Sequence, residues 1–422
     1  MYSPRSVTIF VAIFICFSLF LLQIISSIFF SFNLSQLNVE FWLVNAFYYV
    51  IQFLFIFTVL CYERVRLLEV GEKIILKKKS ISNVCLFLSL IGIAFMFIDR
   101  VYYRGIDYTS LNFVQIRNVL NANGNAKIGF SSLFSIFGNL FQYLFFYSVI
   151  YIFYYSNKKV KHEFLTFSSI VLCVGLTSFL LGGRSVVMLL LLFVLSLLII
   201  KIISGEINFN FNEILKITFV GVAFLLLVLF LFGFVFYARA STGEVSVAEY
   251  YVSVADHLGV PLKETIVYND ISFLTTLYYV LGMVFMYLDH PLWLMNTIIL
   301  DGGGDGVISI STPVLMLNKF IGFQLAQHDY SGYFISAPAA FYYDFGLLGL
   351  VMSPIALGML FSYFYISWAR NQKSFIRLFL FMSVISFIFF APVLVITNFV
   401  IFLIIAIVMC VIDVVLSKRY RL

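Results

Sequence analysis

The sequence predicts an all-α membrane protein, a bundle of about ten transmembrane helices with one large loop region outside the bilayer, and three observations support this prediction. Hydrophobic residues make up 63% of the 422 residues and charged residues only 11%, whereas a soluble domain carries about a quarter charged residues. The mean hydropathy is +1.06. Apolar runs recur along the whole chain, so we expect residues 1–422 to form a single integral membrane domain.

Ten apolar runs are long enough to predict the transmembrane helices, since a bilayer crossing takes about 20 residues. The first run is too long for the core of a signal peptide and no small-residue cleavage site follows it, so we expect it to be retained. The ten runs cover residues 7–30, 41–62, 81–98, 131–155, 164–182, 185–203, 217–237, 346–368, 378–392 and 394–415. All five cysteines lie within such runs or at their ends, and we expect neither a disulfide nor a metal cluster.

The basic residues predict the orientation of the chain. If both termini lie in the cytoplasm, 18 of the 26 Lys and Arg residues fall on the cytoplasmic side, as the positive-inside rule requires. The formal net charge of +6 therefore reflects topology, and we expect no nucleic-acid partner.

Two segments on the outer side are long, residues 99–130 and residues 238–345. The second contains four of the seven prolines, a glycine-rich run and an apolar stretch at 272–288. That stretch is at the short end for a span, and no basic residue follows it in 289–305 to hold it in the cytoplasm. We therefore expect 272–288 to form an interfacial or re-entrant helix rather than a crossing.

Outward-facing arginines are the first candidates for a functional site. An arginine costs on the order of 2.5–3.5 kcal/mol at the bilayer centre, and its planar fork suits a phosphate group. The candidates for binding an anion are Arg184, Arg239, Arg100, Arg104 and Arg117. Pairing with a nearby acid, or snorkelling to the interface, is an equally good explanation for Arg104 and Arg239.

Two outer residues are candidates for a general base. His328 has a side chain that titrates near neutral pH, and Asp344 places a carboxylate at the membrane edge. An N-cap of the eighth predicted span explains Asp344 equally well. Tyrosines of the outer segments, Tyr103, Tyr330 and Tyr343 among them, suit stacking on sugars, but an aromatic belt at the interface also accounts for such residues. No metal and no cofactor is expected.

The architecture resembles the Wzy-type polymerases of O-antigen and capsule repeat units, with the O-antigen ligases as more distant relatives. The resemblance rests on the span count, the cytoplasmic termini, the late and large outer loop, and two short motifs. One motif is Gly182-Gly183-Arg184 at the start of a span, and the other is Asp344-Phe345-Gly346 followed by Gly349 before the last three spans. The arginine-rich loop motif of some members is absent, and His328 lies further from the Asp-Phe-Gly turn than the ligase histidine usually does.

The resemblance implies a glycosyltransferase of polysaccharide or lipopolysaccharide biosynthesis in the bacterial inner membrane. Its substrates would be two undecaprenyl-diphosphate-linked oligosaccharides at the periplasmic face, with undecaprenyl diphosphate as the leaving group. Asp344 or His328 would be the base, and the five arginines would bind the diphosphate. Membrane lipids, a chain-length regulator and a flippase of the same pathway are the partners implied.

Two other functions stay open at this point. A polysaccharide flippase or other transporter would have more spans, short outer loops and inverted repeats. Another polyprenyl-phosphate-dependent glycosyltransferase, or the ligase, would differ only in the acceptor, which the sequence does not distinguish.

Overall fold

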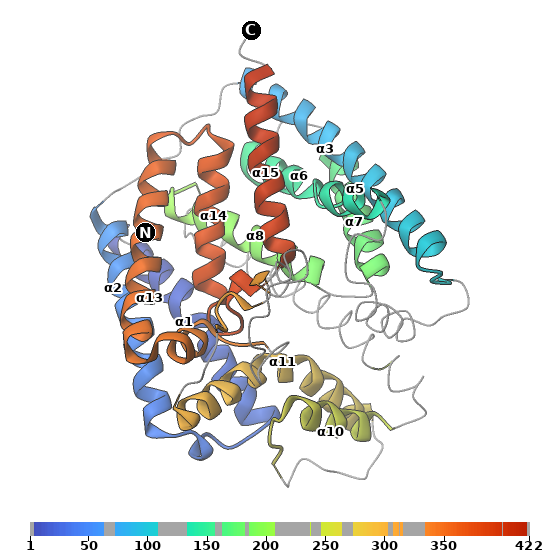
Figure 1. Cartoon of the computed structure of the whole chain (residues 1–422). Coiled ribbons are helices and arrows are strands. Elements are labelled where there is room, and N and C mark those ends of the chain that lie inside the picture. The colour runs from blue at the N-terminus through green and yellow to red at the C-terminus, as the bar shows by residue number, and fades with distance from the viewer. Residues whose placement is uncertain are drawn as a thin grey trace.

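The chain is a multi-pass helical membrane protein, as its composition predicts. The computed structural model describes residues 4–62, 72–108, 133–156, 163–181, 185–206, 237, 246–263, 273–302, 307–311, 313–314, 334–398 and 400–419. Every regular element in these residues is a helix (Figure 1). Within them, eight helices are long and apolar enough to cross a membrane, and two shorter apolar helices, Phe375–Phe390 and Ile401–Ile412, lie near the C-terminus.

The helices coincide with nine of the ten predicted spans, and the remaining one, 217–237, lies outside the described residues apart from residue 237. The nine spans correspond to α1 (Pro4–Phe30), α2 (Val39–Tyr62), α3 (Glu72–Ile98), α5 (Leu133–Phe141) with α6 (Phe145–Ile150), α7 (Glu163–Leu181), α8 (Ser185–Ile203), α13 (Ala337–Arg370), α14 (Phe375–Phe390) and α15 (Val400–Arg419). The two remaining α-helices that concern the site are α10 (Val247–Leu258) and α11 (Phe273–Asp301).

The predicted span 131–155 is not one regular helix. It is divided into α5, α6 and a π-helical turn, η3 (Tyr151–Tyr155), and a second π-helical turn, η2 (Asp99–Tyr103), extends α3. The backbones of α3 and α5 approach closely, because a Cβ atom on Gly92 would lie 2.4 Å from the backbone nitrogen of Gln142. Isolated π-helical turns often occur at functional sites, and η2 carries two of the predicted site residues, Arg100 and Tyr103.

At one end of the bundle, the segments that connect the helices lie around residues 371–374. The hydroxyl groups of Tyr154 and Tyr155 donate hydrogen bonds of 3.5 Å to the carbonyl groups of Gln372 and Lys373, respectively. The ammonium group of Lys78 lies 5.5 Å from the centroid of the Tyr155 ring. We call this the 371–374 end.

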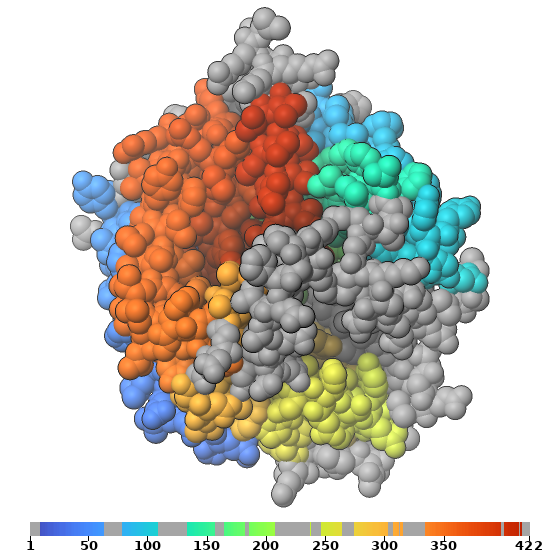
Figure 2. Space-filling view, viewed as in Figure 1, coloured from blue at the N-terminus to red at the C-terminus, as the bar shows by residue number. Residues whose placement is uncertain are grey.

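A second set of connecting segments lies around residues 31–38, between α1 and α2, and we call this the 31–38 end. The backbone nitrogen of Lys263 donates to the carbonyl of Ser31 (3.0 Å), and that of Val395 donates to the carbonyl of Ile335 (2.8 Å). In Figure 1, α10 and α11 lie at this end, far from the C-terminus, and Figure 2 shows α10 at the surface there. The connections at the two ends are those that the charge pattern assigns to opposite sides of the membrane.

Helix α10 has strong boundaries on both sides. Ser246 and Glu249 form a capping box at its start, and Gly259 adopts a left-handed conformation (φ 64°) at its end. Tyr251 is buried, and its hydroxyl group donates to the carbonyl of Phe30 at the end of α1. The helix is thereby held against the 31–38 end.

Helix α11 is longer than the predicted apolar stretch at 272–288, because it continues through Pro291 to Asp301. It packs against α1, α10 and α13. Its length and composition would suffice to cross a membrane. An interfacial position for 272–288 stays a prediction.

Helix α13 begins earlier than the predicted span at residue 346. Its N-cap is Ser336, whose hydroxyl oxygen accepts from the backbone nitrogen of Ala339 (3.4 Å). Asp344 lies in the first of the two helical segments that meet at Gly346, and its carboxylate accepts from Ile308 and Ser309 instead of capping the second segment. The predicted start coincides instead with a kink at Gly346, where φ is 58° and ψ is −144°. A left-handed φ of this kind strains any residue with a Cβ atom.

Gly349, just after the kink, has no room for a side chain. A Cβ atom at Gly349 would lie 2.0 Å from the backbone oxygen of Phe341, which cannot move aside as a flexible side chain could. We expect Gly349→Ala to lower the free energy of unfolding by about 1–3 kcal/mol or more, measured as a lower melting temperature of the purified protein. Gly175→Ala is the matched control, since nothing lies within 4 Å of its Cβ position. Equal melting temperatures for the two variants would contradict this packing.

The orientation in the membrane can be tested at exposed positions of the described residues. Ser253 lies on the exposed face of α10, and Ser80 is exposed on α3 near the 371–374 end. Because Cys61 is exposed, the variants are made in a Cys61→Ser background. We expect an impermeant thiol reagent to label Ser253→Cys in intact cells and to label Ser80→Cys only after permeabilisation. The reverse pattern would invert the predicted topology.

Candidate functional site

The structure describes five of the ten predicted site residues. Tyr103, Arg100 and Arg104 lie on or directly after η2, and Tyr343 and Asp344 lie on α13 just before its kink. The other five lie outside the described residues: Arg117, Arg184, Arg239, His328 and Tyr330.

Arg100 is buried and is bound to the end of α7. Arg100 is part of η2, and its Nη1 atom donates to the carbonyl oxygen of Leu180 in the last turn of α7. The hydroxyl group of Tyr108 donates to the same carbonyl (3.1 Å). Carbonyl groups at a helix C-terminus carry partial negative charge and favour a cation. The segment 99–108 is therefore joined to α7 directly before Gly182-Gly183-Arg184.

The guanidinium group of Arg100 keeps hydrogen-bonding capacity. Its Nε atom is buried and has no hydrogen-bond partner among the described residues. Arginine carries five N–H donors in a planar fork, and the contact with Leu180 uses one nitrogen. An anion at this place could accept from the others.

Arg104 is occupied by an ion pair. Its Nε atom lies 3.0 Å from Oδ2 of Asp99, whose side chain is fully buried while that of Arg104 is 21% exposed. This contact agrees with the alternative in which Arg104 pairs with a nearby acid. Of the two described arginines, Arg100 is thus the better candidate for an anion.

The predicted tyrosines differ in exposure. Tyr103 is 55% exposed, and the centroid of its ring lies 5.9 Å from that of Phe134. Tyr343 is half-buried and packs against the apolar cluster that contains Tyr251 and Met295. Exposed Tyr103 suits either a sugar or an interfacial belt.

The side chain of Asp344, on α13, binds the backbone of the turn at Ile308 and Ser309. Its Oδ1 atom accepts from the backbone nitrogen of Ile308 (2.6 Å), and its Oδ2 atom accepts from that of Ser309 (2.9 Å). The carbonyl of Ser309 in turn accepts from the hydroxyl group of Thr397. The carboxylate therefore joins three segments that are far apart in the sequence, and it retains lone pairs because each oxygen has two acceptor sites.

The arginine group and Asp344 occupy different sides of the described bundle. Helices α3, α5 and α7, which carry the Arg100 region, lie on one side of α14 and α15, and α13 lies on the other (Figure 1). Among the described residues, no hydrogen bond or ion pair joins Arg100 or Arg104 to Asp344. The predicted cations and the predicted base thus form two groups of residues.

A buried acid at the 31–38 end was not among the predicted site residues. Asp289 of α11 is 0% exposed, and its Oδ2 atom accepts from the hydroxyl group of Ser31. His290 follows it and is also buried, and Lys263 donates from Nζ to the carbonyl of Ile28 nearby. The sequence signal is an Asp-His-Pro run directly after an apolar stretch. Asp and Pro are common in turns, but here the run continues as helix.

A further acid, Glu249 at the start of α10, is engaged in a capping box. Its side chain accepts from the backbone nitrogen of Ser246 (2.8 Å), and the hydroxyl oxygen of Ser246 accepts from the backbone nitrogen of Glu249 (3.1 Å). These backbone and side-chain hydrogen bonds with Ser246 lower the pKa of Glu249. A carboxylate with a lowered pKa is a weaker base, so Glu249 is a poor candidate for proton abstraction.

No protein-family model, curated protein or solved structure matches this chain. The class that the fold defines is a helical multi-pass membrane protein.

Proposed function

We propose that the protein is a membrane glycosyltransferase of the Wzy type. It would join undecaprenyl-diphosphate-linked oligosaccharide repeat units of O-antigen or capsule at the periplasmic face of the bacterial inner membrane. The observation that carries the proposal is Arg100, a buried arginine at one end of a membrane bundle with an unpartnered Nε among the described residues. Arg100 donates a hydrogen bond to the carbonyl group of Leu180, which stands four residues before Arg184 in the sequence.

The reaction needs positive charge at the leaving group. A hydroxyl oxygen of the acceptor sugar attacks the anomeric carbon of the donor chain, and the bond from that carbon to the diphosphate breaks, with inversion. The hydroxyl proton goes to a base, and undecaprenyl diphosphate leaves with the bonding electrons. Fixed donors aimed at the developing charge are worth about 10²–10³ in rate for a single donor. Arg100 and Arg184 would supply them without a metal or cofactor.

Asp344 and His328 are the proposed alternatives for the base. The described contacts of Asp344 support a position in which its carboxylate is held in one orientation. A base must lie within about 3 Å of the hydroxyl group that it deprotonates. For Asp344 and the arginines to act together, a long substrate would have to extend between the two groups.

Both termini would lie in the cytoplasm, and residues 99–130 and 238–345 would lie in the periplasm. The partners would be the lipid-linked oligosaccharides, membrane lipids, and a chain-length regulator and flippase of the same pathway.

The test is reconstitution of the purified protein in liposomes with lipid-linked oligosaccharides extracted from the bacterium that encodes it. We expect a ladder of products that differ by one repeat unit, together with release of undecaprenyl diphosphate. Movement of the lipid across the bilayer without a new glycosidic bond would identify a flippase. Transfer only to an added lipid A-core acceptor would identify a ligase. Either result would overturn the proposal.

A further inference from the structure

A stripe of polar side chains runs along the buried face of α2. Asn45, Tyr48, Tyr49 and Gln52 stand at positions i, i+3, i+4 and i+7, so they lie on one side of the helix. All four are at most 2% exposed. Gln52 lies close to the midpoint of α2, at a depth where polar groups are costly and usually functional.

The helices that cover this stripe are α1 and α13. The ring of Tyr49 packs against Phe20 of α1 with centroids 5.2 Å apart, and Tyr48 lies beside Ser353 of α13. Ser353 donates to the carbonyl of Gly349 (2.6 Å). One residue later, Pro354 has no N–H group, so the carbonyl of Leu350 loses its α-helical donor. We call this row of buried polar side chains between α1, α2 and α13 the polar seam.

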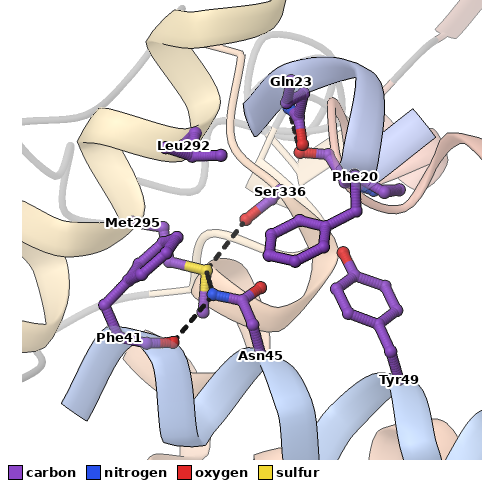
Figure 3. A pocket seen from close by; sticks show the side chains of 9 residues that line it. Phe20, Gln23, Phe41, Asn45, Tyr49, Leu292, Met295 and Ser336 are labelled. Carbon is purple, nitrogen blue, oxygen red and sulfur yellow. Dashed lines mark hydrogen bonds between the residues drawn. The ribbon is translucent and has the colours of Figure 1, made fainter. Parts of the chain in front are cut away.

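The polar seam begins at a crevice near the 31–38 end. The crevice is lined by Phe20, Gln23, Phe41, Asn45, Tyr49, Leu292, Met295, Ser336 and Pro392. Figure 3 shows the Asn45 side chain between α2 and Met295, and the Tyr49 hydroxyl group pointing from α2 toward α1. The Asn45 amide donates to the carbonyl of Phe41 (2.9 Å) and contacts the Met295 sulfur (3.3 Å).

Three side chains of the polar seam, Tyr48, Tyr49 and Gln52, have polar atoms without a hydrogen-bond partner among the described residues. Among the described residues, neither the oxygen nor the nitrogen of the Gln52 amide has a partner, and the same holds for the Tyr49 hydroxyl group. Leaving a buried donor or acceptor unsatisfied costs about 1–3 kcal/mol. Native structures satisfy most buried polar groups with protein or with ordered water.

The chemistry of the lining restricts the occupant. The polar side chains are amides and hydroxyl groups, and no charged residue lines the crevice, so nothing there offsets the charge of an ion. The crevice is too narrow for a sugar and, as it stands, for a water molecule. Met295 has a flexible thioether side chain that can move aside. A small, neutral molecule that both donates and accepts hydrogen bonds fits this lining.

We propose that the polar seam binds water, which enters at the crevice beside Met295 and reaches Gln52 near the middle of the bilayer. The distance from Asn45 to Gln52 along α2 is about 10 Å at 1.5 Å per residue, and bound water would supply the hydrogen-bond partners that Tyr49 and Gln52 lack among the described residues. The inference does not depend on the proposed glycosyl transfer.

The test is X-ray hydroxyl-radical footprinting of the full-length protein in lipid nanodiscs, with mass spectrometry to locate the oxidised residues. Radicals form from water, so a buried side chain reacts quickly only where water is bound next to it. We expect Tyr49 to be oxidised several-fold faster than Tyr251, and Met295 several-fold faster than Met283. All four side chains are at most 2% exposed, and the hydroxyl group of Tyr251 already donates a hydrogen bond to the carbonyl group of Phe30.

A variant tests the role of Gln52 itself. Gln52→Leu removes both amide groups with little change in volume, and we expect it to slow the oxidation of Tyr49 several-fold while that of Tyr251 is unchanged. Equal rates for Tyr49 and Tyr251 in the unmodified protein would overturn the proposal without any variant. An unchanged rate for Tyr49 in a folded Gln52→Leu protein would overturn it as well.

Discussion

Arg184→Ala is expected to abolish polymer formation and to leave the amount of protein in the membrane unchanged. The residue itself lies outside the described residues, but the turn of α7 that precedes it binds Arg100. Arg100 and Arg184, on adjacent segments, would therefore both bind the diphosphate. Removing one such donor costs about 10²–10³ in rate. Arg184→Lys is expected to restore little activity, because a point charge does not replace a bidentate fork. A polysaccharide ladder on a gel and an immunoblot of the membrane fraction measure the two quantities.

Arg100 and Arg377 provide a matched pair for the same test. Each donates from Nη1 to a helix carbonyl, Arg100 to Leu180 at one end and Arg377 to Ser367 (3.0 Å) near the 371–374 end. We expect Arg100→Ala to reduce polymer strongly, whereas Arg377→Ala retains it, because only Arg100 lies on the side assigned to the diphosphate. Full-length polymer in both Arg184→Ala and Arg100→Ala would remove these arginines from the reaction.

Asp344→Asn is expected to abolish polymer and to leave single repeat units on the acceptor lipid. The structure complicates this substitution, because both carboxylate oxygens accept backbone hydrogen bonds and an amide can replace only one of them. Hydrogen bonds to a charged group contribute about 1.5–3 kcal/mol each, so some loss of stability is expected from the turn alone. Thermal unfolding of the purified variant measures that loss.

Thr397→Val is the control that separates the turn from the chemistry. It loosens the same turn by removing the hydrogen bond to the carbonyl of Ser309, and it leaves the Asp344 carboxylate in place. We expect Thr397→Val to retain polymer at a reduced level. If Asp344→Asn retains polymer at the same level as Thr397→Val, Asp344 acts only as an anchor. His328→Ala would then be the next variant to assay.

The spans were predictable because the length of an apolar run compared with the thickness of a bilayer is a local property. The boundaries of the helices were less predictable. The early start of α13 depends on the Ser336 cap and on a kink at Gly346, and both interrupt a run whose hydrophobicity continues across them. The apolar stretch at 272–288 ends before Asp289 and Pro291, residue types that are common in turns, whereas α11 continues through both, and Asp289 and His290 are buried.

The sequence by itself determined that this protein is a multi-pass helical membrane protein, and it singled out arginines and an acid on one side as candidates for chemistry. Only the tertiary structure decided which partners the described candidates have. It pairs Arg104 with Asp99, binds Arg100 to a carbonyl 80 positions away, and joins Asp344 to the turn at Ile308. Hydrophobic length acts within each helix, whereas a hydrogen bond depends on how helices distant in the sequence pack together.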